Sequence, residues 1–383
     1  MKDNRKFTYQ IIDTEPELED FAKILEGEKI VAVDLEADSM YHFKEKVCLI
    51  QISVREINVI IDPLQIEDLS SLRPFFQRND IKKVFHGADY DVRSLHRDFN
   101  IEINNLFDTQ IACRFLGIRE TGLEAVLHKI FNISLDKKYQ KKDWSQRPLP
   151  EDMIEYATRD VLYLVQLAEI LDKELEKKGR LSWVHEECED LSKVRAASSD
   201  TDPLYLRFKG AGRLYPRSLA VLERLLHVRK EIAEKKDRPV FKIFGNDTLM
   251  KIARSMPVSL KQLEKIRALS RKQNVMYGNL LVEAVTEASK APEKDLPFYP
   301  RKKAPVLPPK APERVKALKR WRDARAQKLE IDPALISNKS LLNTISIKNP
   351  CNIEELESVR EMKNWQIQAF GKDIITVLRK LNK

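Results

Sequence analysis

Hydrophobic and polar positions follow two different periodicities in the first half of the chain. Apolar, β-branched runs at 29–35, 47–54, 57–62 and 81–86 predict strands, because such runs suit a buried pleated sheet. Helical patterns lie at about 15–26, 68–77, 89–99, 108–117, 122–131 and 150–178. Strands combined with helices in this order predict an α/β domain with a mixed sheet.

The second half has almost only helical periodicity. Segments at 216–236, 246–254, 259–267 and 271–289 predict one small bundle, and segments at 312–329, 333–337, 339–346, 352–357 and 363–382 predict another. Between them, residues 290–313 hold seven of the 18 prolines, a density that prevents helix and favours an extended connection. We therefore expect domains at 1–200, 205–290 and 312–383, with a proline-rich linker at 291–311.

Composition narrows the class of protein. The 383 residues are 43% hydrophobic and 33% charged, which suits several packed domains. No apolar run reaches the ~18 residues that suggest a membrane span, and the polar, acidic start is unlike a signal peptide. The four cysteines lie far apart without a C-x-x-C pair, which argues against a zinc ribbon or a disulfide framework and predicts a cytoplasmic location. No P-loop motif occurs, so a P-loop motor is excluded.

The net charge of +9 conceals an uneven distribution. Residues 1–200 carry a net charge of −10, whereas residues 201–383 carry +19. This asymmetry favours a carboxylate-rich site in the first half and a polyanion-binding surface in the second. Two differently charged domains without a shared ligand are the alternative.

Two motifs in the first half place carboxylates at the ends of predicted elements. Asp34 and Glu36 follow the apolar run IVAV, and residues i and i+2 of a strand face the same way, so both should project from one face. An exposed polar strand terminus is the alternative. In HGADYDV (86–92) a strand gives way to a helix, where Asp89 suits a cap and Asp91 could point elsewhere.

A third motif is YATRD (156–160). Tyr156 and Asp160 are four residues apart on a predicted helix and therefore share a face, although a surface Tyr–Asp contact would give the same spacing. Four carboxylates brought together from three separate elements would repel each other unless cations held them together, and oxygen ligands select Mg²⁺ or Mn²⁺. Two such ions about 4 Å apart can stabilise the attacking and leaving oxygens in phosphodiester cleavage.

The order VAVDLEAD, HGADYDVRSL, EYATRDVLYL resembles the three exonuclease motifs of the DEDD superfamily, and KDWSQRPLPEDMIEYATRD is similar to the segment before the third motif in the ribonuclease D family. Glu155 stands where the histidine branch has its histidine, so the tyrosine branch is indicated. RPVFKIFGNDTLMKIARSMP (238–257) resembles the core of an HRDC domain, and 312–383 resembles a second, more diverged copy. The resemblance implies a ribonuclease H-like α/β exonuclease domain followed by two all-α HRDC-type bundles.

The resemblance also implies roles for the motif residues. Asp34 would bridge two divalent metal ions, Mg²⁺ or Mn²⁺. Glu36 and Asp160 would hold the nucleophile-side ion and Asp91 the leaving-group ion, while Tyr156 would hydrogen-bond the attacking water. The implied activity is 3′→5′ exoribonuclease hydrolysis that releases nucleoside 5′-monophosphates. Its implied substrates are tRNA precursors and other structured RNA with a free 3′ end, and it implies no membrane and no obligate protein partner.

The basic second half is expected to contact RNA phosphates and present the 3′ end to the acidic site. Tyr215 and Trp321 lie among its charges and could stack on bases, but we expect both in the core. A DNA 3′→5′ exonuclease in repair is one alternative, disfavoured because no polymerase or helicase segment accompanies it. An inactive RNA-binding scaffold is another, disfavoured because all four carboxylates and the tyrosine are present.

Overall fold

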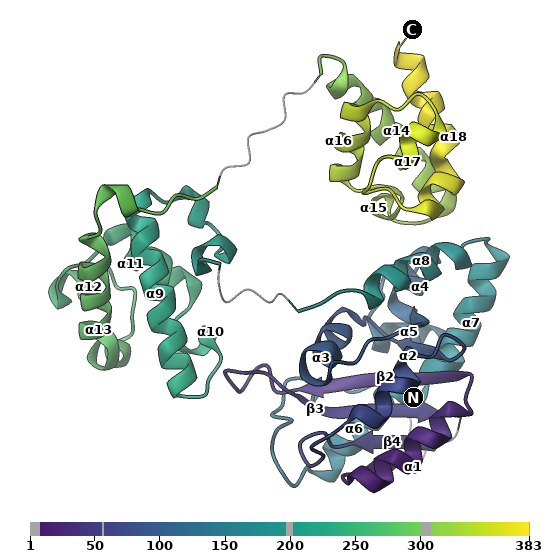
Figure 1. Cartoon of the computed structure of the whole chain (residues 1–383), viewed down its shortest axis with the longest axis horizontal. Coiled ribbons are helices and arrows are strands. Elements are labelled where there is room, and N and C mark those ends of the chain that lie inside the picture. Colours follow the sequence, from purple (N-terminus) through teal and green to yellow (C-terminus); the bar gives the residue numbers. More distant parts are fainter. Residues whose placement is uncertain (1–7, 56, 197–201, 301–307, 383) are drawn as a thin grey trace. The chain divides into compact units, whose positions relative to one another are not determined.

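The computed structural model describes residues 8–55, 57–196, 202–300 and 308–382 (Figure 1). The chain forms two compact units. One contains Met1–Ala37, Val47–Ala196 and Pro305–Lys383, and the other contains Asp38–Lys46 and Ala197–Ala304. Within the described ranges, none of the helices has the length and hydrophobicity to span a membrane. Part of the predicted linker, 301–307, lies outside the described residues.

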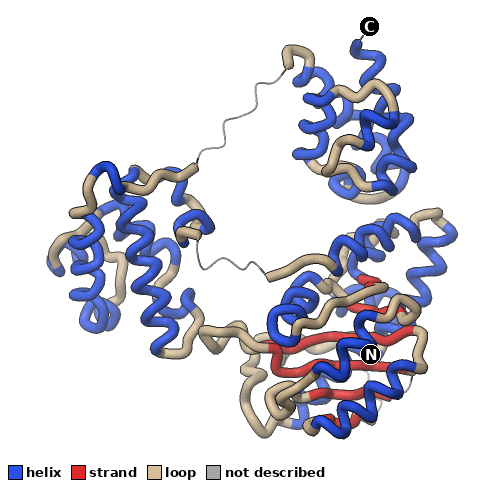
Figure 2. Tube along the Cα trace, viewed as in Figure 1, coloured by secondary structure: helices blue, strands red, loops and turns tan. Residues whose placement is uncertain are grey.

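A mixed sheet of six strands organises the first unit, in the order β1-β4-β3-β2-β5-β6. The strands are drawn in red in Figure 2. The strands are β1 (Gln10–Ile12), β2 (Ile30–Ala37), β3 (Val47–Val54), β4 (Ile57–Ile61), β5 (Lys82–Phe85) and β6 (Leu106–Asp108). β3 is antiparallel to both β2 and β4, and the other neighbours are parallel. The four apolar runs are confirmed as strands, whereas β1 and β6 were not predicted.

Helices surround this sheet and account for most of the remaining exonuclease-like segment. They are α1 (Glu15–Glu26), α2 (Arg73–Gln77), α3 (Asp89–Phe99), α4 (Thr109–Phe115), α5 (Leu123–Phe131), α6 (Glu151–Leu162), α7 (Leu164–Lys177) and α8 (Leu181–Ser192). The helical pattern predicted over 150–178 is confirmed, but the structure divides it at Tyr163 into α6 and α7. α8 was not predicted.

Side chains of the central strands alternate between two hydrophobic clusters. Ile50 and Ile52 of β3 join the largest cluster, together with residues of α1. Leu49 of β3 and Ile60 of β4 join a smaller cluster with Ala157 and other residues of α6. α6 therefore covers the face of β2, β3 and β4 on which Asp34 and Glu36 project.

The C-terminal segment of the first unit is a helical bundle. Its helices are α14 (Ala311–Leu329), α15 (Pro333–Ile336), α16 (Lys339–Lys348), α17 (Ile353–Glu357) and α18 (Asn364–Asn382). All five predicted helices are confirmed, with shifts of one or two residues at their ends. Trp321 is partly buried against the core, as expected, with its ring edge-on to Phe370 at 5.9 Å.

This bundle shares the hydrophobic core of the α/β segment. The Trp365 ring at the start of α18 stacks on Trp183 of α8, with centroids 4.8 Å apart, and meets Phe115 edge-on at 5.4 Å. The Glu186 carboxylate accepts hydrogen bonds from the backbone N–H groups of Asn364 (2.7 Å) and Trp365 (2.8 Å), which satisfies the N-terminus of α18. The two segments are thus joined by apolar and polar contacts.

The second unit is a separate helical bundle with its own core. Its helices are α9 (Pro216–Lys235), α10 (Val240–Ile243), α11 (Asn246–Ser255), α12 (Leu260–Lys265) and α13 (Arg271–Ser289). α9, α11, α12 and α13 confirm the predicted helices. The expectation that Tyr215 lies in the core is wrong: it precedes α9, outside the packed helix faces, and is 83% exposed.

Candidate active site

The first two carboxylates lie on β2, in the middle of the sheet. Asp34 and Glu36 are two residues apart on the strand and therefore project from the same face, as predicted. Asp34 pairs with Gln51 of the antiparallel strand β3, and Glu36 pairs with Leu49. A register shift follows Glu36, so the bulge lies next to the site.

The third carboxylate, Asp91, lies in the first turn of α3. The turn before α3 passes through Gly87 at φ +82°, a conformation that L side chains rarely adopt. The buried carboxylate of Asp108 accepts hydrogen bonds from the N–H groups of Gly87 (3.1 Å) and Ala88 (2.8 Å). It also caps α4 through Gln110 and Ile111, so one carboxylate fixes the start of both helices.

Asp89 and Asp91 lie two residues apart but in different surroundings. The Asp89 carboxylate forms an ion pair with Arg93 at 3.0 Å, and its side chain is 62% exposed. It stands at the first position of α3, while Ala88 occupies the cap position without a side-chain hydrogen bond, so Asp89 is an ion-pair partner rather than a cap. Asp91 is only 6% exposed. The structure therefore places Asp91, and not Asp89, toward the other candidate residues.

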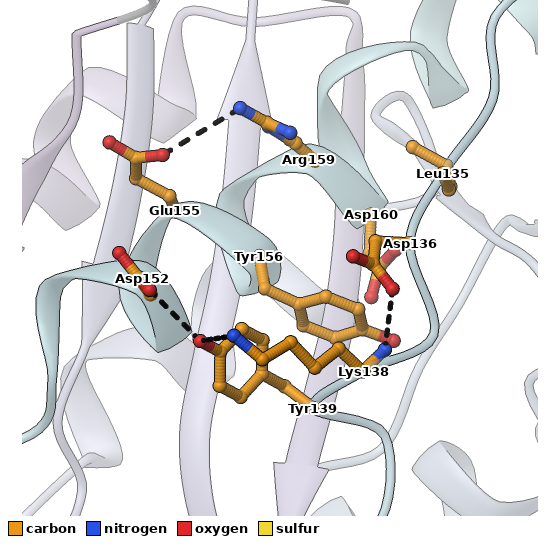
Figure 3. A pocket seen from close by; sticks show the side chains of 9 residues that line it. All are labelled: Leu135, Asp136, Lys138, Tyr139, Asp152, Glu155, Tyr156, Arg159 and Asp160. Carbon is orange, nitrogen blue, oxygen red and sulfur yellow. Dashed lines mark hydrogen bonds and ion pairs between the residues drawn. The ribbon is translucent and has the colours of Figure 1, made fainter. Parts of the chain in front are cut away.

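The last two candidates lie on α6, where Tyr156 and Asp160 share a face. Figure 3 shows the Tyr156 phenol directed toward Asp160. Two aromatic rings contact Tyr156: Tyr139 lies edge-on at 5.9 Å and Trp144 lies tilted at 6.1 Å. The hydroxyl group of Tyr139 donates in turn to Asp152 of α6 at 3.0 Å. The phenol is thus held in place from two sides.

Burial raises the pKa values of all four carboxyl groups, and repulsion by neighbouring carboxylates adds to the rise at Glu36, Asp91 and Asp160. Burial raises the pKa of Asp34 to about 7. The pKa of Glu36 lies well above its usual range, because of burial first and then the charges of Asp34, Asp160 and Asp91. Asp91 and Asp160 are raised in the same way, each by burial and then by Asp34. The charge of Asp34 contributes to the raised pKa of each of the other three groups, so Asp34 lies within reach of all of them.

The pKa of Tyr156 is also raised, by burial and then by the nearby carboxylates. Its phenol therefore stays protonated at neutral pH and is a hydrogen-bond donor. Asp160 accepts a hydrogen bond from this hydroxyl, which partly opposes the rise of its own pKa.

A cavity of about 340 Å³ opens beside Asp34, Tyr156 and Asp160. Several residues that the sequence did not single out also line it, among them His86, Gln110, Lys137 and Gln140. The imidazole of His86 contacts the hydroxyl of Thr109 (2.9 Å) and the carbonyl of Thr121 (2.8 Å), and burial lowers its pKa. His86 lies within the motif HGADYDVRSL, and Lys137 and Gln140 lie five and two residues before the segment KDWSQRPL. Their closeness to these motifs in the sequence was the signal that could have identified them.

The donor set suits hard divalent cations. Its four carboxylates offer only oxygen ligands, and their raised pKa values show how strongly the site resists four uncompensated charges. In the described part of the chain, no three His, Cys, Asp or Glu side chains are already arranged as a complete metal-binding group. Binding a cation would therefore require these side chains to adjust toward it.

Comparison with known proteins gives the same domain order. A family model described as 3'-5' exonuclease matches residues 9–176, and the HRDC domain model matches residues 218–285 and 311–378. The chain is similar to Escherichia coli RNase D, described as an exoribonuclease involved in structured RNA processing, with a TM-score of 0.74 and 26% identity over 98% of this chain and 99% of that one. It is also similar to the catalytic core of RRP6 from Trypanosoma brucei, with a TM-score of 0.63 and 30% identity over 74% of this chain and 81% of that one.

Ribonuclease D of Pseudomonas paraeruginosa is 27% identical over 91% of this chain and 92% of its own length. The chain spans less of the RRP6-like proteins of Arabidopsis thaliana, 19% of RRP6-like 3 and 42% of RRP6-like 1. Fold, motif order and domain matches together define a 3'-5' exonuclease domain accompanied by HRDC domains. The chain belongs to the ribonuclease D family of these exonucleases.

Proposed function

We propose that this protein is a metal-dependent 3′→5′ exoribonuclease that trims the 3′ ends of structured RNA, including tRNA precursors, and releases nucleoside 5′-monophosphates. The observation that carries the proposal is the group of four buried carboxylates beside a protonated tyrosine, of which Asp34, Asp160 and Tyr156 line an open cavity. The similarity to ribonuclease D over nearly the whole chain supports RNA as the substrate.

The carboxylates are proposed to hold two divalent cations, Mg²⁺ or Mn²⁺. Asp34 would contact both ions, as the resemblance to the exonuclease motifs implies. Glu36 and Asp160 would complete one site and Asp91 the other. When bound, the cations supply electrostatic stabilisation of the attacking and leaving oxygens. Once cations were bound, the buried carboxylates would hold these charges in place before substrate arrives, so that little reorganisation would be needed during the reaction.

Tyr156 is proposed to orient the water that attacks the terminal phosphodiester. Its protonated phenol can donate a hydrogen bond, and the rings of Tyr139 and Trp144 restrict its movement. A positioning role of this kind lowers the barrier by alignment rather than by proton transfer. We therefore expect Tyr156→Phe to slow single-turnover cleavage without weakening Mn²⁺ binding.

The test uses 5′-end-labelled RNA and DNA of one sequence, incubated with Mg²⁺, Mn²⁺ or EDTA, and with Asp34→Asn as the inactive control. We expect stepwise shortening of the RNA from its 3′ end, release of nucleoside 5′-monophosphates, and no cleavage with EDTA or Asp34→Asn. Preferential degradation of DNA would assign the alternative repair activity. RNA binding without cleavage under any condition would indicate a scaffold.

The second unit offers a surface for the RNA strand. Around the start of α9 the chain exposes a basic–aromatic surface, consisting of Arg207, Lys209, Arg213, Tyr215 and Phe298. The hydroxyl of Tyr299, next to Phe298, donates to the carbonyl of Leu206 at 3.0 Å, which holds the two parts of this surface together. Exposed aromatic rings among basic side chains suit stacking on unpaired bases next to phosphate contacts.

This surface can be tested by substitution. Losing one stacking ring typically costs about 1–3 kcal/mol, so Tyr215→Ala should weaken binding of single-stranded RNA by about five- to a hundredfold or more. Val275→Ser, at an equally exposed site on α13, is the matched control. Binding is measured by fluorescence anisotropy at a fixed salt concentration. Equal affinity of Tyr215→Ala and wild type would remove this surface from the proposal.

A further inference from the structure

Gln51 of β3 is a buried polar residue without a partner. Its side chain is 0% exposed, and neither its amide nitrogen nor its amide oxygen has a hydrogen-bond partner among the described residues. Buried amides in folded proteins are nearly always hydrogen-bonded, and an unpaired one weakens the fold. A residue of this kind in the middle of a sheet therefore requires an explanation outside packing.

The strand register places this amide beside the candidate active site. Gln51 is directly opposite Asp34 on one side and directly opposite Ile60 of β4 on the other. Residues directly opposite each other in antiparallel strands project from the same face, with Cβ atoms about 5 Å apart. Asp34, Gln51 and Ile60 therefore form one row across three strands.

The helix that carries the other candidate residues covers this row. α6 contacts β2, β3 and β4, and Ile60 packs with Met153 and Ala157 of α6. Tyr156 and Asp160 lie on the same helix. The Gln51 amide is thus enclosed between the sheet and α6, next to the Asp34 carboxylate.

We propose that Gln51 is a positioning residue for the cation site: when cations are bound, its amide N–H donates a hydrogen bond to the Asp34 carboxylate. The inference rests on the proposed function. A neutral amide suits this task, because it can orient an ionised carboxylate without adding the positive charge of a lysine, which would compete with the cation. Hydrogen bonds to metal-ligating carboxylates from such neighbours typically change metal affinity by about 10- to 100-fold.

The unpartnered state of the amide gives the proposal a distinctive signature. In the cation-free protein Gln51 has no hydrogen bond to lose, so Gln51→Met, which keeps the length and removes the amide, should leave the thermal stability in EDTA unchanged or higher. The same substitution should weaken Mn²⁺ binding by about tenfold or more. If Gln51 only filled space in the core, its replacement by methionine would not weaken Mn²⁺ binding while leaving the stability in EDTA unchanged.

The experiment measures Mn²⁺ binding to the full chain by isothermal titration or EPR, without RNA, together with thermal unfolding in EDTA. Ile60→Val, on the other side of Gln51 in the same row, controls for altered packing and should keep wild-type Mn²⁺ affinity. Wild-type affinity of a folded Gln51→Met would overturn the proposal. Gln51→Leu serves as a second apolar variant. If both Gln51→Met and Gln51→Leu lost stability in EDTA, the amide would be needed in the cation-free fold, and the proposal would be wrong.

The outcome separates this inference from the proposed function. If the wild-type chain neither binds Mn²⁺ nor shortens RNA, the function is wrong whatever Gln51 does. If the wild type does both and Gln51→Met matches it in Mn²⁺ affinity, the function stands and the role of Gln51 alone is rejected.

Discussion

At the scale of single residues, the site depends on environment rather than on residue type. Asp89 and Asp91 have the same side chain and are separated only by Tyr90, yet one is paired with Arg93 in solvent and the other is buried among carboxylates. The sequence alone gave no periodicity that separates them, because both fall in the first turn of a helix. The resemblance to the exonuclease motifs selected Asp91, and the structure buries it.

Asp89 and Asp91 provide a matched test, because the same substitution, aspartate to asparagine, can be made at both positions. Asp91→Asn should lower the single-turnover rate of RNA cleavage by about a hundred- to a thousandfold, the size typical of a lost electrostatic contribution to the transition state. Asp89→Asn should leave the rate close to that of the wild type, because it removes only an exposed ion pair. Comparable losses in both variants, measured under the same Mn²⁺ concentration, would contradict the assignment of Asp91.

Gln51 shows what sequence patterns conceal at this scale. It lies within the run VCLIQISV, which predicts a buried strand and gives no indication of a separate role for one polar position. Only the register, which sets Gln51 opposite Asp34, and the lack of a hydrogen-bond partner bring it to notice. Such long-range pairing is a property of the folded sheet and is not encoded in local periodicity.

The raised carboxyl pKa values predict a pH-dependent response to cations. The folded-state pKa of Asp34 is about 7, above its ordinary value of 3.8, so the folded, cation-free protein binds this proton more tightly than the unfolded chain does. The stability from this group is complete below about pH 3.8 and is lost as the pH rises through about 7. Glu36, Asp91 and Asp160 act in the same direction.

Cation binding removes these protons, so Mn²⁺ affinity should increase as the pH rises through about 7. The increase in unfolding temperature caused by Mn²⁺ should grow over the same interval. His86 does not oppose this trend, because burial lowers its pKa and keeps the imidazole neutral there. Thermal unfolding with Mn²⁺ or EDTA across this pH range measures the effect, and a Mn²⁺ response that is constant with pH would show that the carboxylates are already ionised.

At the scale of elements, the sequence predicted the long strands and helices well and the short or interrupted ones poorly. β1 and β6 have three residues each, too few for a two-residue alternation to stand out. The break between α6 and α7 falls at Tyr163, where no proline or glycine announces it. This break separates the helix that carries Tyr156 and Asp160 from the one that packs along β2 and β5.

A partly buried ion pair fixes the segment that precedes α6. The Arg147 guanidinium donates two hydrogen bonds to Asp62 at the end of β4 (2.5 and 2.6 Å) and further bonds to the carbonyls of Cys48 and Trp144. Arg147 thereby attaches the segment containing Trp144 to the sheet. Because Trp144 contacts the ring of Tyr156, this attachment also limits the position of the phenol.

Arg147→Met should therefore reduce stability and activity together. It leaves the Asp62 side chain, 9% exposed, without its counter-charge, and such a loss typically costs about 3–5 kcal/mol. Lys177→Met removes the exposed pair with Glu174 and should cost less than about 1 kcal/mol. Urea unfolding gives the two values, and a similar small loss in both variants would show that the Arg147 pair has no special structural role.

At the scale of the whole molecule, the structure explains part of the charge asymmetry between the two halves of the chain. The acidic half contains the four carboxylates of the site, and the basic half supplies both helical bundles. The two bundles differ in their surroundings, however. The C-terminal bundle shares a hydrophobic core with the α/β segment, whereas the bundle of α9–α13 has a core of its own. Sequence resemblance identified two copies of one domain but not this difference, which depends on residues such as Trp183 and Trp365 meeting across the chain.

The shared core predicts that the C-terminal bundle stabilises the α/β segment. Gly117, at φ +85°, packs so closely on the backbone of Glu330 that an added Cβ would lie 2.2 Å from its carbonyl oxygen. Lys363 adds ion pairs with Glu187 (2.7 Å) and Asp190 (2.8 Å) of α8. These contacts lie around the stacked rings of Trp183 and Trp365, so the centre of the interface is apolar and its edge is charged.

Trp365→Ala tests this arrangement, because it removes the ring that contacts both Trp183 and Phe115. A buried tryptophan replaced by alanine typically costs about 3–5 kcal/mol, so the unfolding transition of the first unit should shift by that amount. Val275→Ala, at a site 83% exposed in the second unit, should change stability by less than about 0.5 kcal/mol. If the contacts of the Trp365 ring do not stabilise the fold, urea unfolding of Trp365→Ala will match that of the Val275→Ala control. If the bundle supports the α/β segment, exonuclease activity will be lost at the same urea concentration as the fold, and at a lower one than in the wild type.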